Sequence, residues 1–149
     1  MKKMLLTAIL GLCCFLVKAQ SLTISNTSGC TVNYYIAATD PACSSIAGSV
    51  TYSIAPGGSV TFASFGAVTW SGGTPGTGWQ WDYIKEWNSC GPMSWTPPAC
   101  GQNVCAVGIP CSGLPTSSCM IITTTCNTCS AIKTQWFALG GGNVGVRIW

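Results

Sequence analysis

Apolar and polar residues alternate with a period of two along much of this chain, and this pattern constrains its fold more than any other feature. The alternating sets are Leu22/Ile24, Val32/Tyr34/Ile36, Val50/Tyr52/Ile54, Val60/Phe62, Ile132/Thr134/Trp136/Ala138 and Val144/Val146/Ile148. Successive side chains of a strand point to opposite faces, so such sets indicate half-buried β-strands. No long segment has the spacing of an amphipathic helix. We therefore expect an all-β fold, an antiparallel β-sandwich of the Ig-like or jelly-roll style.

Glycine-rich turns separate these predicted strands. Pro56, Gly57 and Gly58 are expected to close one hairpin, and residues 140–143 are expected to close a second. The run 140–145 also matches the GxGxxG pattern of dinucleotide-binding loops. Only four residues follow it, too few for the helix that must receive the phosphate. We interpret the run as a hairpin turn.

Residues 1–19 have the features of a secretory signal peptide. Two lysines precede an apolar run over residues 4–17, and small residues occupy the −3 and −1 positions before Gln20. The run is shorter than the roughly 20 residues that cross a bilayer, so an uncleaved anchor is the weaker alternative. We expect cleavage before Gln20, no membrane span afterwards, and one secreted domain over residues 20–149, located extracellularly or in the periplasm.

Cleavage would also change the charge of the protein. It removes three of the six basic residues and leaves Lys85, Lys133 and Arg147 against Asp40, Asp82 and Glu86. Phosphate backbones and anionic lipids attract proteins of positive charge, so a neutral domain is not expected to bind nucleic acid. Near-zero charge favours association, so self-association is expected as a second possibility.

Cysteines are the main covalent constraint. The nine that follow residue 19 are expected to form disulfides, as in other exported proteins; they are Cys30, Cys43, Cys90, Cys100, Cys105, Cys111, Cys119, Cys126 and Cys129. Seven lie within residues 88–129 among many glycines and prolines. This composition predicts a long loop region that disulfides hold in place, with short strands near 104–107 and 120–125.

Two details of the cysteine pattern lead to further expectations. Cys30 and Cys43 are close in sequence, and we expect them to pair. Nine is an odd number, so at least one thiol is free, modified or bonded to another chain. Cys126 and Cys129 form a CxxC, for which a structural disulfide is favoured over a metal or redox site, because no second CxxC and no helix accompany it.

Histidine is absent, which excludes the commonest general base and most catalytic zinc and copper sites. Asp82 and Glu86 could form the carboxylate pair of a glycosidase. On a strand they would lie about 13 Å apart, beyond the roughly 5 to 9.5 Å that such mechanisms use. We expect both to be solvated charges on the outer face of a strand, and we expect no enzyme, metal or cofactor.

Aromatic residues cluster in the middle of the chain, at Trp70, Trp79, Trp81, Tyr83, Trp87 and Trp95. In a regular strand, Trp79, Trp81, Tyr83 and Trp87 would share one face, with Gln80, Asp82, Ile84 and Glu86 on the other. Three interpretations stay open: a core stripe, a platform that stacks on sugar rings, and a protein contact surface.

The favoured function is therefore a secreted, non-enzymatic binding module. It would recognise a glycan or another cell-surface polymer through these six aromatic residues, with Gln80, Asp82 and Asn88 as polar partners. The alternative is a self-associating structural or adhesive cell-surface protein.

Overall fold

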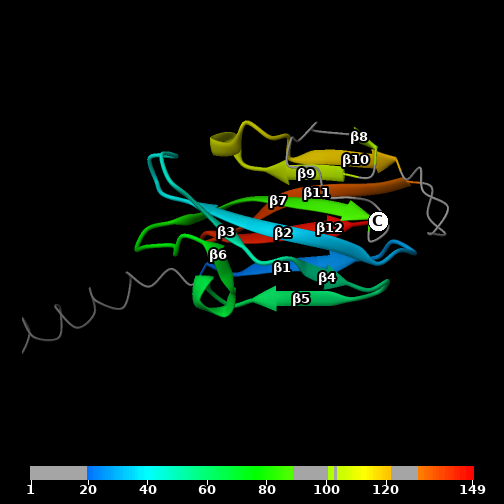
Figure 1. Cartoon of the computed structure of the whole chain (residues 1–149), viewed down its shortest axis with the longest axis horizontal. Helices are drawn as coiled ribbons and strands as arrows, with labels where there is room; N and C mark the ends of the chain where they lie inside the picture. Colours follow the sequence, from blue (N-terminus) through cyan, green and yellow to red (C-terminus); the bar gives the residue numbers. More distant parts are fainter. Residues whose placement is uncertain (1–19, 89–100, 103, 122–130) are drawn as a thin grey trace, which may run out of the picture.

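Two sheets make up the described part of the protein (Figure 1). The computed structural model describes residues 20–88, 101–102, 104–121 and 131–149. Sheet A has the order β5 (Ser59–Phe62), β1 (Leu22–Asn26), β12 (Asn143–Ile148), β11 (Ala131–Gly140), β10 (Ser117–Ile121) and β8 (Gly101–Gln102). Sheet B has the order β6 (Trp70–Gly72), β3 (Ile46–Ser49), β2 (Val32–Thr39), β7 (Gln80–Asn88) and β9 (Val104–Gly108), and β4 (Tyr52–Ile54) also pairs with β2. The short 3₁₀ helices are η1 (Phe65–Ala67) and η2 (Pro110–Ser112).

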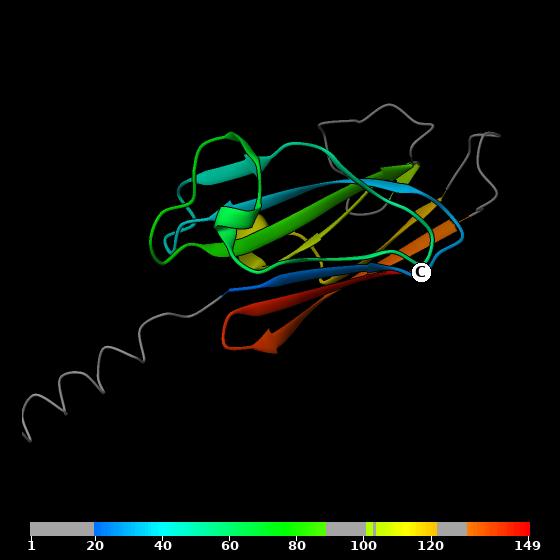
Figure 2. The same ribbon diagram turned by 90° about the horizontal axis from the view of Figure 1, so that it is seen from below.

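The sheets lie one above the other and share an apolar core (Figure 2). Alternate residues of the strands fill it, including Leu22 and Ile24 from β1 and Val146 and Ile148 from β12. The all-β prediction is confirmed. Most strand pairs are antiparallel, but β1 pairs with β12 in parallel, as does β8 with β10. Within the described ranges, no helix has the length and apolar character needed to cross a membrane.

The turn at Pro56–Gly58 does not close a hairpin, contrary to the prediction. The strand before it, β4, pairs with β2 in sheet B, whereas the strand after it, β5, pairs with β1 in sheet A. The turn therefore carries the chain from one sheet to the other. Buried Asn26 holds it in place, because its side-chain amide donates to the carbonyl oxygens of Ile54 (3.1 Å) and Ala55 (3.2 Å).

The hairpin at residues 140–143 is confirmed. Its turn joins β11 to β12, and Gly140, Gly141 and Gly142 all have positive φ, which explains why glycine occupies these positions. The strand expected near 104–107 is also confirmed, as β9, and β10 covers the start of the one expected at 120–125. Residues 122–125 lie outside the described residues. The short strands β3, β6 and β8 were not predicted, because none contains an alternating apolar set.

Strand β7 contains a β-bulge at Asp82. In its pairing with β2, Ala37 lies opposite Tyr83 and Ala38 lies opposite Trp81, so Asp82 is the extra residue. The bulge shifts the alternation of the strand by one position, and Trp81 therefore faces the core together with Ile84. The prediction that Trp81, Tyr83 and Trp87 share one face is wrong for this reason.

Glu86 lies in the core, which overturns the expectation of a solvated charge. It is completely buried, and the hydroxyl of Thr134, on β11 in the opposite sheet, donates to its Oε2 (2.5 Å). Its Oε1 has no hydrogen-bond partner among the described residues. Burial raises the pKa of Glu86 to about 8, since a charge is poorly solvated in the core. The carboxyl group is therefore largely protonated at neutral pH.

We predict that Glu86→Gln stabilises the protein at alkaline pH. In the unfolded chain this carboxyl titrates near pH 4.5, so the folded state binds the extra proton between about pH 4.5 and 8, and stability falls as pH rises through that window. The variant should match the native protein near pH 4 and exceed its unfolding free energy at pH 9 by on the order of 5 kcal/mol. Urea unfolding across this pH range measures the difference.

Asp40→Asn is the matched control, because the pKa shift of Asp40 has the opposite sign. Hydrogen bonds from the side chain and backbone of Ser44 lower the pKa of Asp40, which is partly exposed. Its stabilising effect is therefore lost only as pH falls below about 4. An unchanged pH profile in the Glu86→Gln variant would contradict burial of the Glu86 carboxyl.

Candidate functional site

The predicted aromatic residues do not form one exposed row. Trp81 and Trp87 are only 2% and 6% exposed, while Trp70, Trp79 and Tyr83 are partly buried. Trp95 lies outside the described residues. A flat platform on β7 is therefore not present, because the bulge separates the side chains that were expected to form it.

Trp81 belongs to an aromatic cluster inside the domain. Its ring centroid lies 4.3 Å from that of Phe65 and 6.3 Å from that of Trp70, which stacks on it. The Nε1 of Trp70 donates to the carbonyl oxygen of Phe65 (2.9 Å). The indole rings are thus held by packing and hydrogen bonds within the protein, as the core interpretation expects.

Tyr83 faces outward and lines a cavity of about 270 Å³, which we call the tyrosine cavity. Its walls are Tyr35, Ile46, Tyr83, Lys85, Ala106, Ser112 and Leu114. Of these only Tyr83 was among the predicted binding residues. Tyr35 could have been identified from the sequence, because it occupies the outward position between two core residues of an alternating strand.

The floor of the tyrosine cavity is the outer surface of sheet B. Tyr35, Lys85 and Ala106 lie side by side on β2, β7 and β9, and Tyr83 lies one row further along. The rings of Tyr35 and Tyr83 are 6.2 Å apart between centroids and inclined by 34°. Gly48 on β3 makes room for Tyr35, because a Cβ at Gly48 would lie 1.6 Å from the Tyr35 hydroxyl oxygen.

The polar groups of the cavity have shifted pKa values. Burial raises the pKa of Tyr35, an effect that a hydrogen bond with Tyr83 partly offsets. Burial, and then the neighbouring charges of Tyr35 and Asp82, raise the pKa of Tyr83 to about 12. Burial lowers the pKa of Lys85. The two phenols therefore stay neutral over the physiological range and can both donate and accept hydrogen bonds.

Asp82 lies behind this cavity and not on a solvated face, which corrects the second carboxylate prediction. It is 1% exposed, and burial raises its pKa, while hydrogen bonding from Ser112 lowers it by less. The Ser112 hydroxyl itself donates to the carbonyl oxygen of Ile109 (2.8 Å). Among the described residues, neither oxygen of Asp82 has a partner with good hydrogen-bond geometry. Buried Asp82 and Glu86 are thus unavailable as an exposed acid–base pair.

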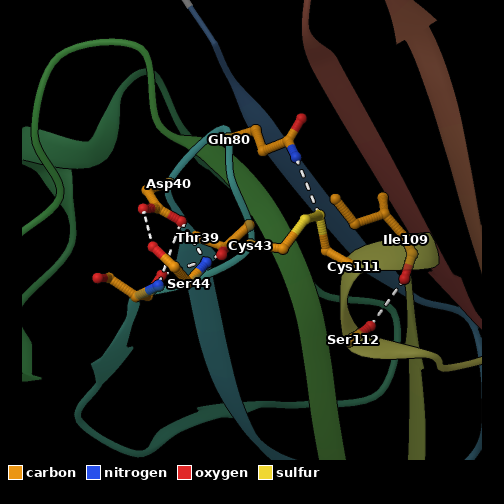
Figure 3. The surroundings of a disulfide bond; sticks show 9 residues. Thr39, Asp40, Cys43, Ser44, Gln80, Ile109, Cys111 and Ser112 are labelled. Carbon is orange, nitrogen blue, oxygen red and sulfur yellow. Dashed lines mark hydrogen bonds between the residues drawn. A yellow bond between two sulfur atoms is a disulfide. The ribbon is translucent and has the colours of Figure 1, made fainter.

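A disulfide between Cys43 and Cys111 joins the two sides of the cavity rim (Figure 3). It connects the turn between β2 and β3, which precedes Ile46, to η2, which precedes Leu114. The predicted pairing of Cys30 with Cys43 is therefore wrong, although Cys30 is also disulfide-bonded. Proximity in sequence failed because the fold brings together cysteines 68 residues apart.

Hydrogen bonds fix both sides of this disulfide (Figure 3). Asp40 caps the β2–β3 turn, because its Oδ1 accepts from the backbone N–H of Ser44 (2.7 Å) and its Oδ2 accepts from the Ser44 hydroxyl (2.6 Å). On the other side, the Nε2 of Gln80 donates to the Sγ of Cys111 (3.4 Å). The cavity rim is therefore rigid on either side of the bond.

Close backbone approach at Gly108 brings η2 over the edge of sheet B. A Cβ at this position would lie 2.6 Å from the carbonyl oxygen of Asp82 and 2.8 Å from the Oγ of Ser112. The backbone N–H of Ile109 donates to the same carbonyl oxygen of Asp82 (2.9 Å). The bulge residue thus supports the loop that carries Ser112 and Leu114.

A second hollow, the end groove, lies where the β11–β12 hairpin meets the start of β7. It has a volume of about 280 Å³ and is lined by Gln20, Gln80, Trp81, Ile109, Trp136, Ala138, Gly140, Gly142, Asn143 and Val144. The Nε1 of Trp81 donates to the carbonyl oxygen of Gln20 (3.1 Å). The described part of this lining contains amides and indoles but no charged side chain.

Only some of the cysteines that were expected to form disulfides lie within the described residues. Cys105, on β9, is buried in the core. Cys126 and Cys129 lie outside the described residues, as do Cys90 and Cys100. Within the part of the chain that the structure describes, no group of three or more Cys, Asp or Glu residues is placed to hold a metal ion.

Comparison of the chain with protein-family models, with curated proteins and with solved structures finds no match in any of the three.

We predict that replacing both Cys43 and Cys111 by serine lowers the unfolding free energy by about 2–4 kcal/mol, because the unfolded chain regains the freedom of a long loop. The double variant avoids leaving a reactive partner thiol. Denaturant unfolding under non-reducing conditions measures the loss. A double variant as stable as the native protein would contradict a bond between these two cysteines.

Proposed function

We propose that the protein is an exported, non-enzymatic binding module, and that the tyrosine cavity binds one sugar residue of a glycan or cell-surface polymer. The observation that carries this proposal is the paired arrangement of Tyr35 and Tyr83, with Lys85 and Ser112 beside them, in a cavity on a rigid sheet.

The size and chemistry of the cavity support this ligand class. Its volume of about 270 Å³ is slightly below the range of roughly 300 to 1,000 Å³ that drug-sized ligands occupy. Aromatic rings pack against the apolar faces of sugars, and the neutral phenols, the ammonium and the hydroxyl meet the polar edge of such a ring. Ile46 and Leu114 add apolar contact on opposite sides.

Preorganisation of the rim also supports binding. The disulfide between Cys43 and Cys111 and the tight packing at Gly108 hold both sides of the cavity, so a ligand orders few groups when it binds. A disulfide is characteristic of oxidising compartments, which agrees with export after cleavage before Gln20. We also propose that the two facing sheets form a β-sandwich, which serves as the scaffold of this cavity.

The absence of histidine, together with the burial of Asp82 and Glu86, supports a binding role over catalysis. A glycosidase needs one carboxyl to protonate the leaving group and a second at the sugar ring. Glu86 is completely buried between the sheets and faces away from the tyrosine cavity.

We predict that Tyr83→Ala weakens binding of the recognised saccharide by at least about tenfold, because it removes one ring of the pair. Tyr83→Phe should lose less, since it keeps the ring and removes the hydroxyl alone. A glycan array with the native protein identifies the probe, and isothermal titration measures its affinity. Phe137→Ala, on the outer face of sheet A, is the control and should leave affinity unchanged.

Two results would contradict this proposal. One is a native protein that binds no saccharide on the array. The other is equal affinity in the native protein and the Tyr83→Ala variant, provided that thermal unfolding shows both to be folded.

The second candidate function is self-association through the outer face of sheet A. Phe137, Leu139 and Trp149 are among the large apolar side chains that remain exposed, and Leu139 is 55% exposed. Cys105 is buried in the core, so its side chain is not available for cross-linking at the surface. Association through the outer face of sheet A would be driven by apolar contact.

We predict that a Leu139→Ser/Trp149→Ser variant has a lower sedimentation-equilibrium mass than the native protein if this face mediates assembly. Ile46→Ser is the control, because Ile46 is equally exposed but lies on sheet B. A native protein that remains monomeric at the highest soluble concentration would exclude this function.

A further inference from the structure

We propose that the mature chain carries a modified N-terminus, in which Gln20 has cyclised to pyroglutamate and lies in the end groove. This inference rests on the proposed export and on cleavage before Gln20. It concerns a different part of the molecule from the tyrosine cavity.

Hydrogen bonds hold the backbone at Gln20 and Ser21 in a fixed position. The indole N–H of Trp81 donates to the carbonyl oxygen of Gln20 (3.1 Å). The next residue, Ser21, donates from its backbone N–H to the Oδ1 of Asn143 (2.9 Å), and its carbonyl oxygen accepts from the backbone N–H of Val144 (2.9 Å). The residue that cleavage would make the first of the mature protein is therefore docked against the β11–β12 hairpin.

The side chain of Gln20 is also docked. A Cβ on Gly142 would lie 3.0 Å from the Cγ of Gln20 and 3.5 Å from its Nε2, so the side chain runs along the hairpin turn. Its Oε1 is buried and has no hydrogen-bond partner among the described residues. The side-chain carbonyl of Gln20 is therefore enclosed against the hairpin turn.

The charge of a free N-terminus favours the lactam over an open-chain glutamine. Cleavage would leave an α-ammonium group on the same Cα, and among the described residues the lining of the end groove contains no carboxylate that could pair with it. A partly buried ammonium without a counter-charge is costly. A lactam removes this charge and keeps one N–H donor and one carbonyl acceptor.

The reaction needs no oxidant, reductant or co-substrate. The unprotonated α-amine of Gln20 attacks its own Cδ, so the N–Cδ bond forms and the Cδ–Nε2 bond breaks. Nε2 leaves as ammonia after taking up the proton that the amine loses. The product is a five-membered lactam, and the peptide bond to Ser21 is unchanged.

Mass spectrometry of the protein purified from an exporting host tests the modification. We expect the intact mass to fall short of that of residues 20–149, with all disulfides counted, by the mass of one ammonia, and we expect the N-terminal peptide to carry the loss. Gln20→Asn is the matched control, because its shorter side chain would require a strained four-membered ring. It should begin at residue 20 and show no loss.

The possible outcomes separate modification from export. A native chain that begins with an intact Gln20 overturns the modification and leaves export standing. A chain that retains residues 1–19, or begins elsewhere, overturns the cleavage on which the modification depends. Saccharide binding by the tyrosine cavity is measured independently of both.

Enzymatic removal of the lactam tests its docking in the end groove. Pyroglutamyl peptidase should release residue 20 from the denatured, reduced chain and should act at least tenfold more slowly on the native protein. Equal rates on the two forms would show that the lactam is exposed and would overturn its placement in the groove.

Discussion

The β-bulge at Asp82 is the constraint on which the rest of the structure depends. One extra residue in β7 lets Trp81 enter the aromatic cluster of the core and turns Tyr83 and Lys85 outward. Without the bulge, Trp81 and Tyr83 would lie on the same face of β7. Either the core would lose the Trp81 ring or the outer face would lose Tyr83. The carbonyl oxygen of Asp82 also accepts from Ile109, so the same residue positions the loop that closes the cavity.

Polar groups of this protein are distributed in an unusual way. Two of its three carboxyl groups, Asp82 and Glu86, are buried, and burial raises the pKa of both. Asp40 is partly exposed, and hydrogen bonds lower its pKa. The net charge counted from the sequence therefore differs from the net charge at neutral pH, because a protonated Glu86 contributes no negative charge.

Covalent and packing constraints combine at the cavity rim. The Cys43–Cys111 bond links the β2–β3 turn to η2. Gly108 allows η2 to approach β7 closely. Both features favour a site that exists before a ligand binds, which limits the entropy lost on binding. The end groove has a comparable volume but is lined by Gln20 itself, so it holds the residue that lies two positions before β1.

The sequence by itself determined the all-β class, the strands that alternate strictly and the 140–143 hairpin, because these depend on local side-chain periodicity and backbone preference. Tertiary structure alone decided the bulge, the crossing at Pro56–Gly58, the Cys43 partner and the burial of Glu86. Each of these depends on which residues distant in sequence become neighbours. Periodicity assigns a face to a side chain only while the strand stays regular, and in β7 a single extra residue changed that assignment.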